Sequence, residues 1–299
     1  MPDESSTKTS APQFRRFALA VAVLALGFSL PLWRLVRFAA GNDLHSYILL
    51  IPFVSFYLVW LEKKNLPRAP GSARAPAAIF FAAGLAVLAW RFAVKPHFAE
   101  DDLALTTLAF VLFLAGLGCV FLGGALMRAV TFPFALLIFL APFPVVLRNG
   151  IEAFLQHGSA VVADGMFQLS GLPVFRDGMY FQLPGMNLEV APECSGIHST
   201  LVLFITSLVA GRMFLRRPWT RAVLALAVVP LALVRNGFRI FVIGQLCVRI
   251  GPQMIDSPVH RHGGPLFFVL SLAPFFLLLY FLKKSERPGL AIRPTIIPN

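Results

Sequence analysis

Long apolar stretches recur along this chain and are separated by charged residues, prolines and glycines. A helix needs about 20 mostly apolar residues to cross the hydrocarbon core of a bilayer. Eight stretches approach that length, and each predicts a membrane-spanning helix. They cover residues 17–35, 46–61, 77–94, 103–122, 129–147, 195–214, 222–241 and 265–282. The pattern therefore predicts an all-α polytopic membrane protein with about eight transmembrane helices.

Two segments between the fifth and sixth stretches break this pattern. Residues 150–171 carry polar side chains among apolar ones, which predicts an amphipathic helix at the interface or packed inside the bundle. Residues 171–193 contain two turn signals, RDG at 176–178 and PG at 184–185, between short runs rich in Val, Phe, Tyr and Leu. These signals predict a small hairpin-like loop outside the membrane.

Composition supports a membrane protein. Apolar residues make up 58% of the chain and charged residues 13%, with a mean hydropathy of +0.76. Soluble domains are about 45–50% apolar and about 25% charged. The first apolar stretch is not expected to be a cleavable signal peptide, because Pro31, Trp33 and Arg34 stand where cleavage requires small residues.

Basic residues predict the orientation of the spans. If the N-terminus lies inside, most of the 26 Lys and Arg residues fall in cytoplasmic segments, so both termini are expected in the cytoplasm. Residues 1–14 then form a disordered cytoplasmic tail, residues 15–284 a single transmembrane domain, and residues 285–299 a second cytoplasmic tail. The formal charge of +12 would face anionic lipid. Membrane lipid is therefore an expected partner, and nucleic acid is not.

A cysteine stands where the outer loop meets the sixth span, in the sequence ECSG at 193–196. Under this topology Cys194 lies at the outer N-terminus of a helix, where unsatisfied amides and the helix dipole lower a thiol pKa. Gly196 leaves room for another group to approach closely. Cys194 is therefore a candidate nucleophile. Cys119 and Cys247 lie within apolar helix and are interpreted as small apolar fillers.

Two further polar clusters fall on the same side of the membrane. The seventh span ends in RNGFR, which brings Asn236 and Arg239 toward the outer leaflet. A charge at membrane depth costs about 2.5–3.5 kcal/mol on insertion scales, so it needs a partner or a task; Arg235 is interpreted as a lipid-headgroup anchor. The last span follows HRHGG, which leaves His260 and His262 at its outer end. The topology therefore predicts that a thiol, a guanidinium and an imidazole converge from three helices.

Other assignments are open to the same residues. His198 follows Cys194 by one helical turn and is an alternative base. The H-x-H spacing suits a metal ion, but Asp256 is the one obvious further ligand nearby, so neither a metal nor a cofactor is expected. The H-E-x-x-H sequence of a metal-dependent protease is absent from the chain.

These motifs resemble the exosortase and archaeosortase family. The resemblance rests on ECSGIHS, on RNGFRI and on His260 four residues before Gly264, and it covers roughly residues 45–282. It assigns Cys194, Arg239 and His260 to a catalytic site, with His262, Asn236 and His198 as alternative or supporting residues. It implies a cysteine peptidase or transpeptidase of the inner membrane that acts near the periplasmic face. Its expected substrates are exported proteins with C-terminal sorting signals, for example of the Pro-Glu-Pro type.

The chemistry of such a site requires these residue types. Cleavage of a peptide bond by a thiol needs a nucleophile, a group that accepts and donates the proton, and a positive group for the oxyanion. Hydrolysis and transfer to a polysaccharide or lipid acceptor, linked to an exopolysaccharide matrix, both remain open. A different class, a transporter or an assembly factor for exported polysaccharide, would use the polar cluster to line a pathway.

Overall fold

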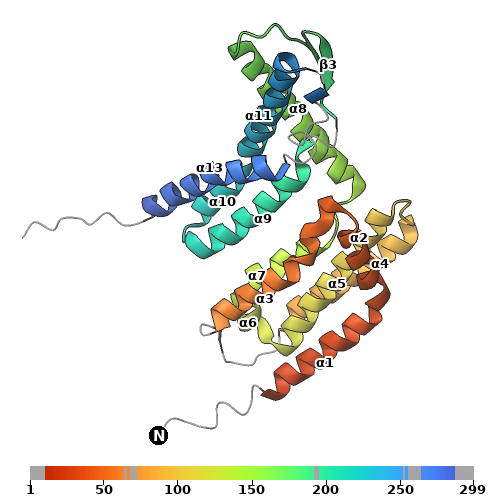
Figure 1. The fold of residues 1–299 in the computed structure, drawn as a ribbon. Coiled ribbons are helices and arrows are strands. Elements are labelled where there is room, and N and C mark those ends of the chain that lie inside the picture. Colours follow the sequence, from red (N-terminus) through yellow and green to blue (C-terminus); the bar gives the residue numbers. More distant parts are fainter. Residues whose placement is uncertain are drawn as a thin grey trace, which may run out of the picture. The chain divides into compact units, whose positions relative to one another are not determined.

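Figure 1 shows the fold in a computed structural model, which describes residues 11–63, 66–67, 73–191, 195–251, 253–254 and 264–286. The described chain is dominated by helices. It divides into two compact units, Met1–Arg148 and Asn149–Asn299. The expectation of one transmembrane domain over residues 15–284 stays a prediction.

The first unit is entirely helical in its described part. Its elements are α1 (Ala11–Gly27), α2 (Ser29–Ala40), η1 (Asp43–Leu49), α3 (Ile51–Glu62), α4 (Arg74–Val94), α5 (Ala99–Phe121), α6 (Gly123–Ala129), α7 (Thr131–Leu136) and η3 (Leu137–Leu140). Helices α4 and α5 pack at glycines that face aromatic rings. A Cβ at Gly84 would lie 2.8 Å from the ring of Phe113, and one at Gly116 would lie 3.0 Å from the ring of Phe81. Small residues thus let the two helices approach closely.

The second unit combines helices with a small sheet. Its elements are α8 (Val145–Leu169, which begins in the first unit), β1 (Phe175–Asp177), β2 (Tyr180–Leu183), β3 (Met186–Glu189), α9 (Ile197–Phe214), α10 (Pro218–Leu226), α11 (Val228–Arg249) and α13 (Gly264–Ser285). The amphipathic helix expected at 150–171 is α8. The hairpin-like loop expected at 171–193 contains a three-stranded antiparallel meander in the order β1-β2-β3.

The membrane spans agree with the hydropathy pattern. Six helical segments of the described chain are long and apolar enough to cross a bilayer, or up to eight if two bent pairs each count as one span. The bent pairs are Gln13–Gly27 with Ser29–Ala40, at 73°, and Gly123–Ala129 with Thr131–Leu140, at 69°. They correspond to the expected spans 17–35 and 129–147. The all-α polytopic fold class is therefore confirmed, and two of its eight expected spans are bent.

Proline explains where both bends occur. Proline has no backbone N–H, so it cannot donate to the carbonyl four residues before it, and its ring clashes with that carbonyl. Pro31 therefore cannot donate a hydrogen bond to the carbonyl of Gly27, the last residue of α1. In the same way, Pro133 cannot donate one to the carbonyl of Ala129, the last residue of α6. Both helices thus end at the residue whose acceptor the proline leaves unpaired.

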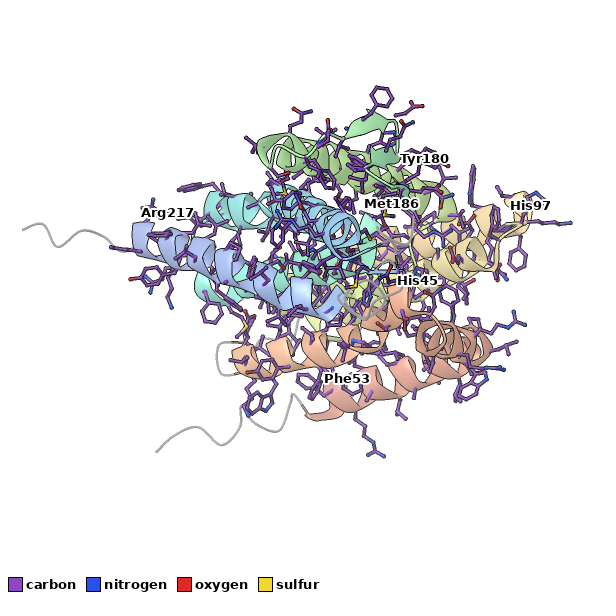
Figure 2. The ribbon with its side chains drawn as sticks, turned by 45° about the horizontal axis from the view of Figure 1, so that its top comes forward. His45, Phe53, His97, Tyr180, Met186 and Arg217 are labelled. Carbon is purple, nitrogen blue, oxygen red and sulfur yellow. The ribbon has the colours of Figure 1, made fainter. Side chains whose placement is uncertain are left out.

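Many large apolar side chains face outward. Phe53 on α3 (labelled in Figure 2) is 73% exposed, and Leu26 on α1 is 74% exposed. Exposed apolar surface of this extent marks a contact with lipid or protein. On spans of this length it is the surface that faces the bilayer.

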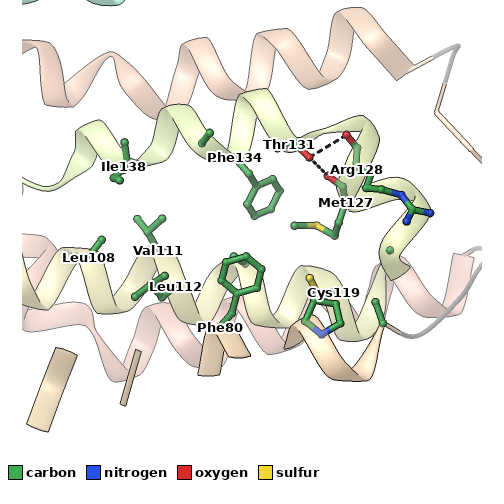
Figure 3. Close-up of a pocket in the computed structure, with 15 residues that line it drawn as sticks. Phe80, Leu108, Val111, Leu112, Cys119, Met127, Arg128, Thr131, Phe134 and Ile138 are labelled. Carbon is green, nitrogen blue, oxygen red and sulfur yellow. Dashed lines mark hydrogen bonds between the residues drawn. The ribbon is translucent and has the colours of Figure 1, made fainter. Parts of the chain in front are cut away.

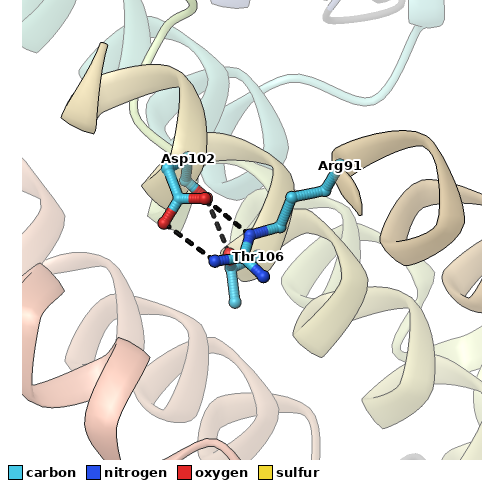
Figure 4. Close-up of polar contacts among 3 residues, drawn as sticks. All are labelled: Arg91, Asp102 and Thr106. Carbon is cyan, nitrogen blue, oxygen red and sulfur yellow. Dashed lines mark hydrogen bonds and ion pairs between the residues drawn. The ribbon is translucent and has the colours of Figure 1, made fainter. Parts of the chain in front are cut away.

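Three carboxylates in the first turn of α5 secure one end of the first unit. Each accepts a hydrogen bond from a different group, as Figure 4 shows for Arg91 and Asp102. The pairs are Arg91 Nε with Asp102 at 2.6 Å, Arg148 Nη1 with Glu100 at 3.0 Å, and the Val145 amide with Asp101 at 2.8 Å. The positive end of the α5 dipole further favours these negative charges. In the described chain, these carboxylates therefore have a structural role, because they tie the first turn of α5 to Arg91, Val145 and Arg148.

In the second unit, the sheet packs against α8 and α11. Its inward residues form one buried cluster with these helices: Ala160, Ala163, Phe167, Phe181, Leu183, Leu188, Val190 and Ile240. Strands β2 and β3 alternate buried and exposed positions, as expected for a sheet covered on one face. Helix α8 reaches α11 through Gly237, where a Cβ would lie 2.7 Å from Val162 Cγ1 and 3.0 Å from the Ser159 backbone oxygen.

Substitution of Gly237 tests this packing. We expect Gly237→Ala to destabilise the protein by about 1–3 kcal/mol, the cost of overpacking a close contact. Gly165→Ala on α8 is the matched control, because nothing lies within 4 Å of its added Cβ; it should be neutral or slightly stabilising, since glycine costs about 0.5–1 kcal/mol in a helix. Thermal unfolding in detergent compares the two, and equal midpoints would contradict a tight contact between α8 and α11.

Candidate active site

The structure describes half of the expected site. Cys194, His260 and His262 lie outside the described residues. Arg239 and Asn236 lie on α11, and His198 lies in the first turn of α9. Helix α9 begins at Ile197, three residues after Cys194, so the described part of the candidate site is the N-terminus of α9 with the α11 residues that contact it.

The N-terminus of α9 is set by Gly196. This residue has φ = +71°, in the left-handed region that glycine tolerates best, and precedes the first helical residue, Ile197. Its carbonyl accepts hydrogen bonds from the Thr200 amide at 3.0 Å and from the hydroxyls of Ser199 at 3.0 Å and Thr200 at 2.8 Å. The helix therefore begins two residues after the expected start of the span at residue 195.

Arg235 lies against this turn. Its Nη2 donates to the Gly196 carbonyl and to Thr200 Oγ1, both at 3.3 Å. The residue is 8% exposed, and within the described chain its Nη1 has no hydrogen-bond partner. The interpretation of Arg235 as a lipid-headgroup anchor is therefore wrong. A guanidinium at membrane depth needs acceptors, and the Gly196 carbonyl supplies one inside the protein.

The close approach of α11 explains why residue 196 is a glycine. A Cβ there would lie 3.0 Å from Arg235 Nη2 and 3.3 Å from Asn236 Oδ1. Asn236 is itself buried, at 2% exposure. The sequences CSG and RNGFR, 39 residues apart between Gly196 and Arg235, are thus in direct contact. The described parts of the two motifs therefore lie against each other, and the expected convergence of Cys194, Arg239 and His260 stays a prediction.

Positive charge is concentrated where the N-terminus of α9 contacts α11. Arg239 follows Arg235 by one turn of α11, so the two guanidinium groups fall on neighbouring positions of one helix face, and their like charges interact. The α9 N-terminus adds the positive end of a helix dipole. His198 is half-buried in the same first turn. The arrangement favours an anion, such as a thiolate or the oxyanion of a carbonyl addition.

Other groups of the described chain do not form a comparable centre. Cys119 and Cys247 are free, buried cysteines, at 3% and 2% exposure, as their interpretation as apolar fillers requires. Among the described residues, no group of three or more His, Cys, Asp or Glu is placed to hold a metal ion.

A cavity of about 780 Å³ lies in the first unit, along α4, α5, α6 and α7. Apolar side chains such as Phe80, Val111 and Phe134 line it, with Ile138 toward one end and Arg128 at the other (Figure 3). The Thr131 hydroxyl bonds back to the carbonyls of Met127 and Arg128. The cavity therefore suits an apolar group.

Together, the fold and this site define a multi-pass membrane protein with a cationic centre where one span begins. The sequence matches the family described as transmembrane exosortase (Exosortase_EpsH) over residues 33–277. This chain therefore belongs to the transmembrane exosortase family. No curated protein and no solved structure gives a significant match. At family level, exosortases are membrane sorting transpeptidases, generally with a cysteine nucleophile, whose substrates are exported proteins with sorting signals.

Gly196→Ala and Gly171→Ala separate backbone strain from site packing. Both glycines have left-handed φ values, +71° and +72°, so alanine should cost about 1–2 kcal/mol at either position. Nothing lies within 4 Å of a Cβ at Gly171, whereas a Cβ at Gly196 meets Arg235 and Asn236. We expect Gly196→Ala to lower the thermal midpoint further than Gly171→Ala. Equal decreases in the thermal midpoint would show that Arg235 does not pack against Gly196.

Proposed function

We propose that this protein is a thiol-dependent sorting peptidase or transpeptidase with Cys194 as nucleophile. The observation that carries the proposal is the contact of Arg235 and Asn236 with Gly196, two residues after Cys194. This contact supports a cationic environment for the thiol, with Arg239 one turn further along α11. Membership of the exosortase family favours this function over a transporter or a polysaccharide-export assembly factor.

In the first step, the Cys194 thiolate attacks the scissile carbonyl of the sorting signal. A C–S bond forms, and the negative charge moves to the carbonyl oxygen, where Arg239 stabilises it; one such donor is typically worth about 3 kcal/mol. His260, or His262 in its place, accepts the thiol proton and returns it to the leaving amine as the C–N bond breaks. The exported protein is then held as a thioester, and the C-terminal signal is released.

In the second step, an acceptor attacks the thioester carbonyl. An amine or hydroxyl of a polysaccharide or lipid would give transfer, and water would give hydrolysis. The histidine takes the acceptor proton, and the Cys194 thiolate leaves. We propose that the signals are of the PEP-CTERM type and that the products belong to an exopolysaccharide or biofilm matrix.

The proposed location follows from the basic residues and the site. Both termini lie in the cytoplasm, and the protein spans the inner membrane several times. Cys194, Arg239 and His260 then act near the periplasmic face, where exported proteins arrive.

Processing of a reporter tests the proposal. The reporter is an exported protein of the same genome that ends in a short motif, an apolar span and a basic tail, with an epitope tag at its C-terminus. We expect wild type to release the tag, and Cys194→Ala and Cys194→Ser to reduce release by at least about 1,000-fold, because the nucleophile is essential. Normal tag release by both variants at normal protein levels would refute a thiol nucleophile.

The two histidines can be separated in the same assay. We expect His260→Ala to reduce processing by about 100- to 10,000-fold, the usual contribution of a general acid or base. His262→Ala is its matched control, two residues away, and should stay within a few fold of wild type. The reverse result would move the base to His262, and full activity in both variants would contradict a base at this position.

A further inference from the structure

Strand β3 is an edge of the sheet in the second unit. In the order β1-β2-β3, it pairs with β2 on one side only. The two-residue turn at 184–185 closes the pair Leu183–Met186, and the Val190 amide donates to the Met179 carbonyl at 3.0 Å. Alternate residues of an antiparallel strand point their N–H and C=O groups to the same side. Met186, Leu188 and Val190 therefore point theirs toward β2.

The backbone groups of Asn187 and Glu189 point the opposite way, toward the open edge. Both residues are exposed, and in the described chain no backbone hydrogen bond is made on that side. One face of the sheet is buried on α8 and α11, while the other is outward, as Tyr180 shows at 50% exposure (Figure 2). Of the features that block strand pairing, this edge has no proline, lysine or bulge; it is a short strand of four residues and carries Glu189. It is therefore a template for an added strand.

The open edge of β3 lies close in sequence to the candidate nucleophile. Cys194 follows Glu189 by five residues, and an extended chain spans at most about 3.6 Å per residue, so the two lie within about 18 Å. After Cys194 the chain enters the membrane as α9. The sorting signal proposed above has the same order, because its short motif precedes its own apolar span. A peptide beside β3 that enters the membrane at the same end must run parallel to β3.

We propose that β3 is the docking strand for the substrate, and that the extended segment before the substrate's membrane span pairs in parallel with Asn187 and Glu189. This inference rests on the proposed sorting function and names how that site holds its substrate. Strand addition supplies affinity through main-chain hydrogen bonds, whatever the side chains of the peptide are. Pairing of this kind would let one cysteine act on exported proteins whose signals differ in sequence.

A proline at the open edge tests the docking strand. Asn187→Pro removes an outward N–H and keeps the bonds between β2 and β3, a position that edge strands tolerate. We expect it to lower processing of the tagged reporter by about five- to tenfold, the loss of one backbone hydrogen bond. Asn187→Ala is the matched control and should process the reporter within about twofold of wild type, because it keeps the N–H. Equal processing by both variants would overturn the proposal.

Cross-linking supplies a second readout that does not depend on the fold of the proline variant. A photoreactive side chain is placed at Asn187 on β3, or at Phe175 on the opposite edge, in a Cys194→Ala background that cannot turn over. We expect the tagged reporter to cross-link from position 187 and not from 175. The docking proposal would be overturned if the reporter cross-linked from position 175 alone or from neither position. It would also be overturned if position 187 cross-linked to a second copy of this chain.

The two proposals fail in different ways. If Cys194→Ala processes the reporter as wild type does, the sorting function itself fails. If processing needs Cys194 but is equal in Asn187→Pro and Asn187→Ala, only the docking strand fails.

Discussion

The hydrogen bond from Arg235 to the Gly196 carbonyl joins the two motifs on which the site depends. A guanidinium on a membrane span must find acceptors inside the protein, and this one finds them where α9 begins. The bond is possible because Gly196 has no side chain and adopts a left-handed conformation. It therefore fixes the turn after Cys194 relative to the face of α11 that carries Arg239.

The rest of the second unit holds this contact in place. Helix α8 packs closely on α11 at Gly237, on the residue that follows Asn236. The sheet covers α8 and α11 with a single buried cluster and continues into the segment that carries Cys194. A soluble-looking loop, an amphipathic helix and two spans thus act as one support. The cationic centre is therefore surrounded by packed elements at the border of an apolar domain.

Much of this fold could be predicted from the sequence, because a bilayer requires long apolar helices. The eight expected spans all correspond to helical segments, and Pro31 and Pro133 mark the two bends that hydropathy alone does not show. The role of Arg235 was missed, since periodicity does not tell a lipid-facing arginine from one that bonds a carbonyl 39 residues away. A glycine beside the cysteine was the available signal. The third strand was missed because RDG and PG each predict a turn, but only the register shows how the strands pair.

The most direct test of the central claim is the reactivity of Cys194 itself toward a membrane-impermeant maleimide, measured against pH in intact spheroplasts. Cys119 and Cys247 are buried, so labelling reports on Cys194. We predict labelling without lysis and a rate that reaches half its maximum below about pH 8.5, the pKa of an unperturbed thiol. Labelling only after lysis, or a midpoint at or above about 8.5, would contradict an activated nucleophile on the outer face.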